Sequence, residues 1–279
     1  MIGSDWFLLG APWDCSGTGR GEQLAPAALR RAGLSDLVDV DLGDAATTIT
    51  STDRDPATGI RALPETVAAA HALAEALHTA RRDHPDRRPL ILGGDCSLLL
   101  GVFLDLGDTG LWIVDGHPDF VDPPDSDTGE TADSELAILT GRSSLSALSP
   151  ADVVLIGHRT ADLDPASAAE LSRLPADLLA LDARAVIDSP AATAALAAAH
   201  TGARPMWLHV DVDVLDPAAL PAVTYPQPGG PGFDQLAALL TPLAAAPALC
   251  GVSVADFRPD LDPDGRRAEQ LVELLSRVL

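Results

Sequence analysis

The stretch Leu111-Trp112-Ile113-Val114-Asp115-Gly116-His117-Pro118-Asp119 joins a short apolar run to a polar cluster at its carboxyl end. Four consecutive apolar residues are typical of a β-strand buried on both faces, as in a parallel sheet covered by helices. Because residues i, i+2 and i+4 of an extended chain point the same way, we expect Asp115, His117 and Asp119 to converge. Such a cluster is costly unless a cation or an opposite charge neutralises it. A turn with one helix-capping acid is the alternative interpretation.

Similar apolar runs recur along the chain and alternate with Ala- and Leu-rich amphipathic stretches. The predicted strands are Trp6–Leu9, Leu37–Val40, Leu90–Leu92, Leu111–Val114, Val153–Ile156, Leu178–Leu181, Met206–Val210 and Gly251–Ala255. The predicted helices are Ala25–Ala32, Glu65–Arg82, Ser97–Leu106, Asp133–Thr140, Ala166–Ser172, Ala191–His200, Asp234–Ala244 and Arg266–Val278. This alternation predicts a single α/β domain over residues 1–279, with a mostly parallel sheet covered on both faces.

The composition is that of a globular protein, with 279 residues of which 47% are hydrophobic. No apolar stretch approaches the ~20 residues that a membrane-spanning helix needs. The amino-terminal MIGSDWFLLGAPWD has no basic region before its short apolar run, so we expect it to form a strand rather than a signal peptide. The expected location is cytoplasmic, without a membrane partner.

The formal net charge is −23, and all 18 basic residues are arginine. An acidic surface repels phosphate backbones and anionic lipid, which argues against nucleic-acid and membrane partners. It favours a small cationic substrate, although solubility alone is the plainer explanation. The three cysteines are too few and too scattered for a disulfide framework or a four-cysteine zinc site.

A second acidic cluster, His209-Val210-Asp211-Val212-Asp213-Val214-Leu215-Asp216-Pro217, follows the apolar run that begins at Met206. Asp211 and Asp213 share a face, and a buried parallel strand has no structural use for paired acids. Asp216 is expected to brace the turn that follows. With the first cluster, these residues provide enough oxygen ligands and one imidazole for two divalent ions, for which manganese fits better than zinc.

A third element is Gly93-Gly94-Asp95-Cys96-Ser97, at the end of the predicted strand Leu90–Leu92. Its glycines allow a sharp turn that would direct Cys96 into the crevice at the strand ends. The residue type leaves three roles open for Cys96, which are a metal ligand, a nucleophile and a small buried hydrophobic residue.

Four sequence blocks resemble the signatures of the ureohydrolase family, which includes arginases, agmatinases and formiminoglutamases. They are GGDCS (93–97), DGHPD (115–119), HVDVDVLDP (209–217) and SVADFRPDLD (253–262), in the family's order and at similar spacing. The opening GAPWDCSGTGRGEQLAPAALRRAGL (10–34) is also similar, so the resemblance covers most of the chain. It implies an arginase-like three-layer α/β/α sandwich, a site for two Mn²⁺ ions, and a homotrimer or homohexamer. The implied metal ligands are Cys96, Asp115, His117, Asp119, Asp211 and Asp213.

The chain departs from the family pattern at three places. Cys96 replaces a histidine ligand, so that one metal per chain is possible instead of two. Asp256 replaces the glutamate that holds the guanidinium group of the substrate. In the loop 122–135, which brings an Asn-x-His-Gly shuttle in arginases, the histidine position is Ala132. Contacts to a different substrate are therefore expected from residues of this loop, namely Thr128, Glu130 and Asp133.

Three further side chains have open roles. His209 can face the site, although a strand histidine of this kind more commonly forms a hydrogen bond behind the ligands. His158 can replace the missing shuttle or be an ordinary loop residue. Arg20 can contact an anionic group of the substrate or lie in solvent.

The sequence thus predicts a manganese-dependent hydrolase of a C–N bond in a guanidino, hydroxyguanidino or amidino compound. A hydroxide that bridges the metals would be the nucleophile. Asp119 would relay the proton, while Asp256 and Glu130 would bind the cationic end of the substrate. Two alternatives remain, a catalytically impaired binding or regulatory protein of the same fold and a mononuclear zinc amide hydrolase.

Overall fold

The computed structural model describes all residues of the chain except 1–2, 143–146, 162 and 164. Eight strands form one sheet in the order β2-β1-β3-β8-β7-β4-β5-β6, and every neighbouring pair is parallel. The strands are β1 (Gly3–Ala11), β2 (Val38–Asp44), β3 (Arg88–Gly93), β4 (Gly110–Val114), β5 (Val153–Ile156), β6 (Leu179–Leu181), β7 (Met206–Asp211) and β8 (Leu249–Ala255). All eight predicted strands are confirmed.

The described α-helices alternate with the strands along the chain, and α9 follows the last strand. They are α1 (Ala25–Arg31), α2 (Leu63–Asp83), α3 (Leu98–Asp105), α4 (Glu135–Ala137), α5 (Pro165–Leu171), α6 (Ala183–Asp188), α7 (Pro190–Thr201), α8 (Phe233–Ala244) and α9 (Arg266–Val278). The prediction of one helix over Asp133–Thr140 is wrong in detail. That segment contains only the short α4, followed by a π-helical turn at Ile138–Arg142 in which Gly141 has a φ of 109°.

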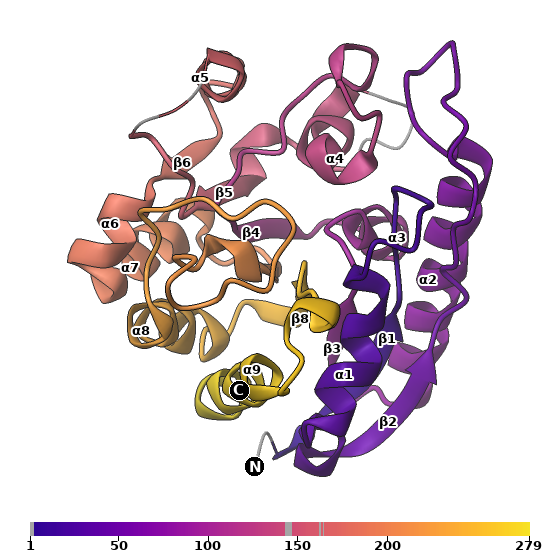
Figure 1. Ribbon diagram of the computed structural model, residues 1–279. Coiled ribbons are helices and arrows are strands. Elements are labelled where there is room, and N and C mark those ends of the chain that lie inside the picture. Colours follow the sequence, from indigo (N-terminus) through magenta and orange to yellow (C-terminus); the bar gives the residue numbers. More distant parts are fainter. Residues whose placement is uncertain (1–2, 143–146, 162, 164) are drawn as a thin grey trace.

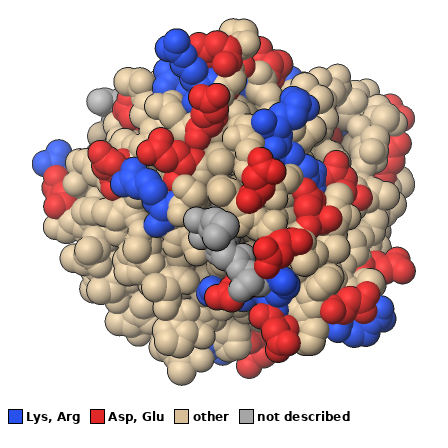
Figure 2. Space-filling model, turned by 90° about the horizontal axis from the view of Figure 1, so that it is seen from below, with Lys and Arg blue, Asp and Glu red and all other residues tan. Residues whose placement is uncertain are grey.

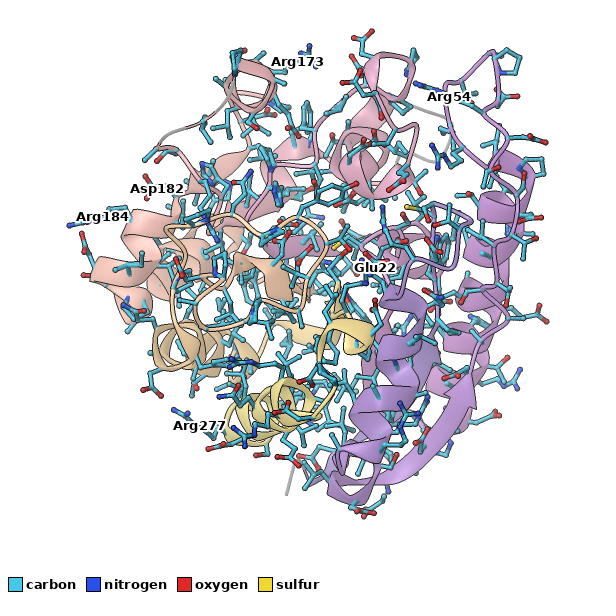
Figure 3. All side chains as sticks on the ribbon, in the orientation of Figure 1. Glu22, Arg54, Arg173, Asp182, Arg184 and Arg277 are labelled. Carbon is cyan, nitrogen blue, oxygen red and sulfur yellow. The ribbon has the colours of Figure 1, made fainter. Side chains whose placement is uncertain are left out.

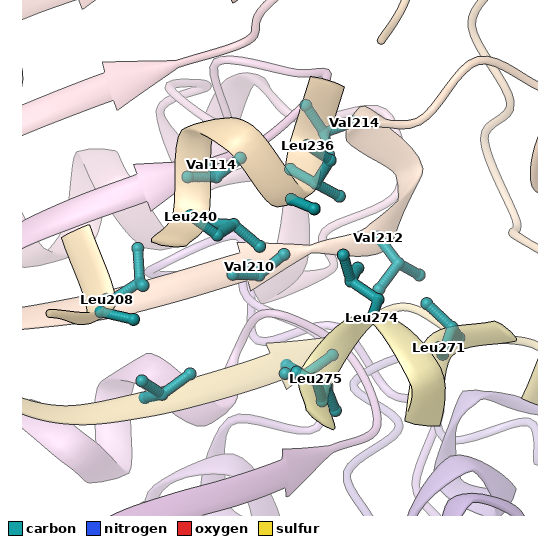
Figure 4. Close-up of a cluster of buried hydrophobic side chains, with 14 of the residues drawn as sticks. Val114, Leu208, Val210, Val212, Val214, Leu236, Leu240, Leu271, Leu274 and Leu275 are labelled. Carbon is teal, nitrogen blue, oxygen red and sulfur yellow. The ribbon is translucent and has the colours of Figure 1, made fainter. Parts of the chain in front are cut away.

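The helices cover the sheet in two layers, as the resemblance implied (Figure 1). One face packs against α1, α6, α7, α8 and α9, and the other packs against α2, α3 and α4. Figure 4 shows part of the first interface, where Leu208 and Val210 of β7 lie between Leu236 and Leu240 of α8 and the leucines of α9. The alternate residue Trp207 belongs to the second core, so β7 is buried on both faces. Among the described helices, none is both long and apolar enough to cross a membrane.

The sheet order places the polar clusters next to one another. The central strands β3, β8, β7 and β4 are adjacent, and each of them ends in one of the clusters singled out in the sequence. Because all strands are parallel, their carboxyl ends meet at one edge, where ligands bind in open α/β sheets.

Candidate metal centre

The ends of β3 and β8 are joined through Gly94, which has to be a glycine. A Cβ atom at this position would lie 1.7 Å from the carbonyl oxygen of Trp13. The Gly94 N–H donates to the carbonyl of Ala11, and the Gly94 carbonyl accepts a 2.7 Å bond from the N–H of Asp256. This close backbone packing positions Cys96 and Asp256 side by side.

One group of possible metal donors consists of Asp115, His117 and Asp213, each with a ligand atom within 4.8 Å of the other two. His117 Nδ1 lies 2.8 Å from Asp213 Oδ2. Burial disfavours the charged imidazole, but the Asp213 carboxylate outweighs it and raises the His117 pKa to about 9. Burial likewise disfavours the Asp213 carboxylate, but His117 outweighs it and lowers the Asp213 pKa.

The second group centres on Cys96, which is 1% exposed. Its Sγ lies 3.0 Å from Asp211 Oδ2 and 2.9 Å from Asp256 Oδ2, and the three residues form a further possible donor set. Burial, followed by the charges of these two carboxylates, raises the pKa of the Cys96 thiol in the absence of a metal. The structure therefore places the Cys96 sulfur among possible metal donors, while the residue also belongs to the second hydrophobic core.

His209 contacts the same sulfur from β7. Its Nε2 lies 2.9 Å from Cys96 Sγ, and its Nδ1 lies 2.7 Å from Ser253 Oγ. Trp207 Nε1 donates to this hydroxyl at 2.9 Å, which leaves the hydroxyl proton for His209 Nδ1. His209 then carries its own proton on Nε2 and donates it to Cys96, a tautomer inferred from the hydrogen bonds.

Asp119 and Asp256 have strained backbones, with φ values of 45° and 68°. Left-handed conformations are uncommon outside glycine and cluster at functional sites. We expected Asp115, His117 and Asp119 to lie on one face of an extended strand. That geometry is wrong, because β4 ends at Val114 and the backbone at Asp119 is left-handed. The Asp119 carboxyl is nonetheless close enough to Asp115 and Glu135 for its charge to interact with theirs.

Apart from Asp213, the aspartates of the two donor clusters and Asp256 resist ionisation. Burial, followed by the charge of Asp213, raises the Asp115 pKa to about 7. Burial also raises the pKa values of Asp119, Asp211 and Asp256, with further increases from neighbouring carboxylates. Buried acids in this number suit bound cations, and Asp115 Oδ2 is buried without a hydrogen-bond partner among the described residues. The donors present therefore fit divalent metal ions.

A cavity of about 380 Å³ opens above these donors. Its lining combines acids from both donor groups with residues of the loop 122–135 and of α5, together with Arg20 and Tyr225. All the sequence-predicted site residues except the buried Cys96 and Asp115 line it; those that do are His117, Asp119, Thr128, Glu130, Asp133, Asp211, Asp213 and Asp256. Ala132, at the expected shuttle position, also lines the cavity.

The loop residues expected to contact substrate are held by other partners. Asp133 accepts hydrogen bonds from the hydroxyl groups of Ser126, Thr128 and Ser134 at 2.7–2.8 Å. Glu130 accepts a 2.8 Å bond from Arg20. These bonds brace the loop, so Thr128 and Asp133 serve first to shape the cavity.

Arg20 lies at the cavity, where its side chain is partly buried. Its guanidinium contacts the carboxylates of Glu22 and Glu130 and packs 5.6 Å from the centre of the Tyr225 ring. Glu22 is fully buried and lies near the centre of the view in Figure 3. Glu130 also has Arg61 Nη1 at 3.7 Å, so its negative charge is shared between two arginines.

Sequence reasoning missed two buried charges beside the site, Arg159 and Glu135. Arg159 donates to backbone carbonyls of the segment after β7, including those of Asp213 and Val214. Glu135 is fully buried at the start of α4. Neither lies in a recognisable block, and the polar neighbours His158, Thr160 and Ser134 give no sign in the sequence that these charges are buried.

His158 is buried, and burial lowers its pKa. It does not line the cavity described above, so the position of this side chain does not suit a proton shuttle.

This all-parallel sheet, with paired donor sets at its carboxyl edge, is the architecture of a metal-dependent α/β hydrolase. The sequence matches the model of the Arginase family over residues 4–279. Arginase from Brucella melitensis is 29% identical, over 98% of this chain and 95% of its own. The N(omega)-hydroxy-L-arginine amidinohydrolase of Streptomyces lavendulae is 29% identical, over 68% of this chain and 67% of its own. The fold agrees with that of Bacillus subtilis arginase at a TM-score of 0.81 and 22% identity, covering 99% of this chain and 98% of that one.

The chain belongs to the arginase family and is a hydrolase of that family.

Proposed function

We propose that the protein hydrolyses a C–N bond of a small guanidino, hydroxyguanidino or amidino compound, with release of urea or a related product. The observation that carries this proposal is the meeting of two donor sets at the floor of one acidic cavity. The names of the relatives, arginase and hydroxyarginine amidinohydrolase, support the same substrate class.

Six residues would hold two Mn²⁺ ions, namely Cys96, Asp115, His117, Asp119, Asp211 and Asp213. Bound divalent ions supply a water nucleophile activated at neutral pH and an electrophile for the bond under attack. Burial of the donors at the sheet edge excludes bulk water, which strengthens their interaction with charge in the cavity.

The remaining chemistry belongs to side chains of the chain itself. Asp119 takes the proton of the attacking water and passes it to the leaving nitrogen, because its carboxyl group lines the cavity beside the metal donors. Asp256 holds the cationic end of the substrate beside Cys96. Glu130 acts indirectly, since it fixes Arg20 at the cavity mouth, where the guanidinium can meet an anionic group of the substrate.

Two measurements test this function. Elemental analysis of protein purified with and without added manganese is expected to give about two metals per chain in wild type. A single metal that becomes two in Cys96→His would mean that the cysteine weakens one position. Metal-loaded protein would then be assayed for urea release from arginine, N-hydroxyarginine and agmatine.

Asp119→Asn is expected to lower kcat at least about a hundredfold, because the amide cannot carry the proton. Asp127→Asn is the matched control, since Asp127 is an exposed acid of the neighbouring loop and should keep wild-type turnover. Unchanged turnover in Asp119→Asn would show that Asp119 does not carry the proton. Two bound metals without turnover of any guanidino or amidino compound would favour a binding or regulatory role instead.

A further inference from the structure

Glu135 is a buried carboxylate that the family pattern does not account for. It is 0% exposed, and both of its carboxylate oxygens are buried without a hydrogen-bond partner among the described residues. Its position is set by the backbone, because the N–H of the next residue, Leu136, donates to the carbonyl of Asp119. An unpaired carboxylate in such a place is expensive unless a cation binds it.

The side chain of Glu135 meets two of the metal donors. One ligand atom each of Cys96, Asp115 and Glu135 lies within 4.8 Å of the other two, and all three residues are at most 1% exposed. Donors on opposite sides of one divalent ion, bound at about 2.0–2.3 Å, are at most about 4.6 Å apart. The three atoms therefore span the space that a single ion would fill after a small adjustment.

The unpartnered atoms identify where the ion would bind. Asp115 Oδ2 has no hydrogen-bond partner in the described part of the chain, whereas Asp115 Oδ1 accepts a 2.7 Å bond from the N–H of His117. The free oxygen of Asp115 and both oxygens of Glu135 are thus available, and Cys96 Sγ receives an N–H from His209. A sulfur that accepts this bond is held in the orientation of a thiolate ligand.

We propose that Glu135 is a metal ligand, which with Cys96 and Asp115 forms a three-donor position. This position would prefer an ion softer than Mn²⁺, such as Zn²⁺ or Co²⁺, to one of the two Mn²⁺ ions of the proposed function. One thiolate and two carboxylates bring three negative charges to the two positive charges of such an ion, and thiolates select against manganese. This inference rests on the proposed function only in sharing its metal centre. The competing account is a proton held between the Glu135 and Asp119 carboxyl groups, which would leave Glu135 unable to bind metal.

The test is a titration of metal-free protein with Co²⁺, followed by its absorption spectrum and by calorimetry. Wild type is expected to show a near-ultraviolet thiolate-to-cobalt charge-transfer band, and Cys96→Ser is expected to lose it. Glu135→Gln, which keeps the shape and removes the charge, should weaken Co²⁺ binding at the thiolate position at least about tenfold. The matched control is Glu273→Gln on α9, which removes an exposed carboxylate far in sequence from the site and should bind as wild type.

An unchanged Co²⁺ affinity and band in Glu135→Gln would overturn the proposal and favour the shared proton. Glu135→Asp gives a second route if the glutamine variant does not fold, because a carboxylate shortened by one methylene should give an intermediate loss of affinity. A Co²⁺ affinity unchanged from wild type in Glu135→Asp would count against the proposal. The readout is metal binding and not turnover. Loss of affinity in Glu135→Gln without guanidine hydrolysis by wild type would sustain the ligand and reject the proposed function.

Discussion

His209 shows how one buried residue couples protonation to stability. Both ring nitrogens contact uncharged groups, the Ser253 hydroxyl and the Cys96 sulfur. Burial is therefore not compensated, and it lowers the His209 pKa from 6.5 to about 3. Between these two pH values the unfolded chain binds a proton that the folded chain does not, so this group lowers stability as pH falls from 6.5 toward 3.

Replacement of His209 by glutamine should remove this dependence, because a glutamine amide can still donate to Cys96 without titrating. Between pH 7.5 and pH 5, metal-free His209→Gln is expected to lose about 2 kcal/mol less of its unfolding free energy than wild type. Urea denaturation at the two pH values measures the difference. An equal loss in the two proteins would mean that His209 is already charged in the folded state.

At the scale of the elements, the conformation of the segment that follows β7 is held by the buried side chain of Arg159. Arg159, 5% exposed, donates to the carbonyls of Gly157, Asp213 and Val214 and also to that of Gln227. These carbonyls have left the sheet ladder, so the guanidinium satisfies groups that would otherwise be buried without donors. The same contacts hold Asp213 against His117.

Arg159→Met is therefore expected to cost about 3 kcal/mol of unfolding free energy and to weaken metal binding through Asp213. Thermal and urea denaturation check the stability, and calorimetry checks the metal affinity. Arg184→Met is the control, because Arg184 is exposed on α6 and points away from the molecule in Figure 3. Among the residues that the structure describes, it forms an ion pair only with Asp188 of its own helix. That variant should change stability by less than about 0.5 kcal/mol. Equal effects would show that Arg159 has no special role.

The inner strands could be predicted because they are buried on both faces and are therefore short apolar runs. The edge strands β2 and β6 are partly exposed and were predictable only from the apolar residues that they retain. The helix α6 was missed because six residues are too few for a periodic pattern, although its capping residue Asp182 was a usable signal. The site residues that converge follow the ends of the adjacent strands β3, β8, β7 and β4. They could be predicted because each of these strand ends carries a recognisable sequence block. Glu135 could not be predicted, because its burial depends on the π-helical turn after α4 and on packing against the Asp119 loop.

At the scale of the whole molecule, the net charge of −23 sets the field that a ligand meets. Figure 2 shows acidic side chains spread over much of one face of the molecule, next to a region with few charges. A field of this sign concentrates cations near the surface, and salt screens it beyond a Debye length. Substrate capture should therefore depend on ionic strength in a way that reveals the charge of the substrate.

For a cationic guanidino substrate, kcat/KM is expected to fall about threefold or more as salt rises from about 0.01 M to about 0.15 M. A neutral substrate of the same class should show little change, and kcat at saturation should be unaffected for both. Initial rates at low substrate concentration measure the effect. An identical dependence of kcat/KM on salt for the two substrates would mean that the acidic surface does not attract the substrate and serves only solubility.

The left-handed backbone at Asp119 and Asp256 has a practical consequence for protein engineering. Glycine adopts this conformation without strain, and at these positions it would also relieve repulsion among crowded carboxylates. A library selected only for heat resistance would thus be drawn toward glycine at both positions and would discard both carboxylates together. Thermostable variants of this chain should be screened for metal retention in the same round, since robustness and chemistry compete for the same two residues.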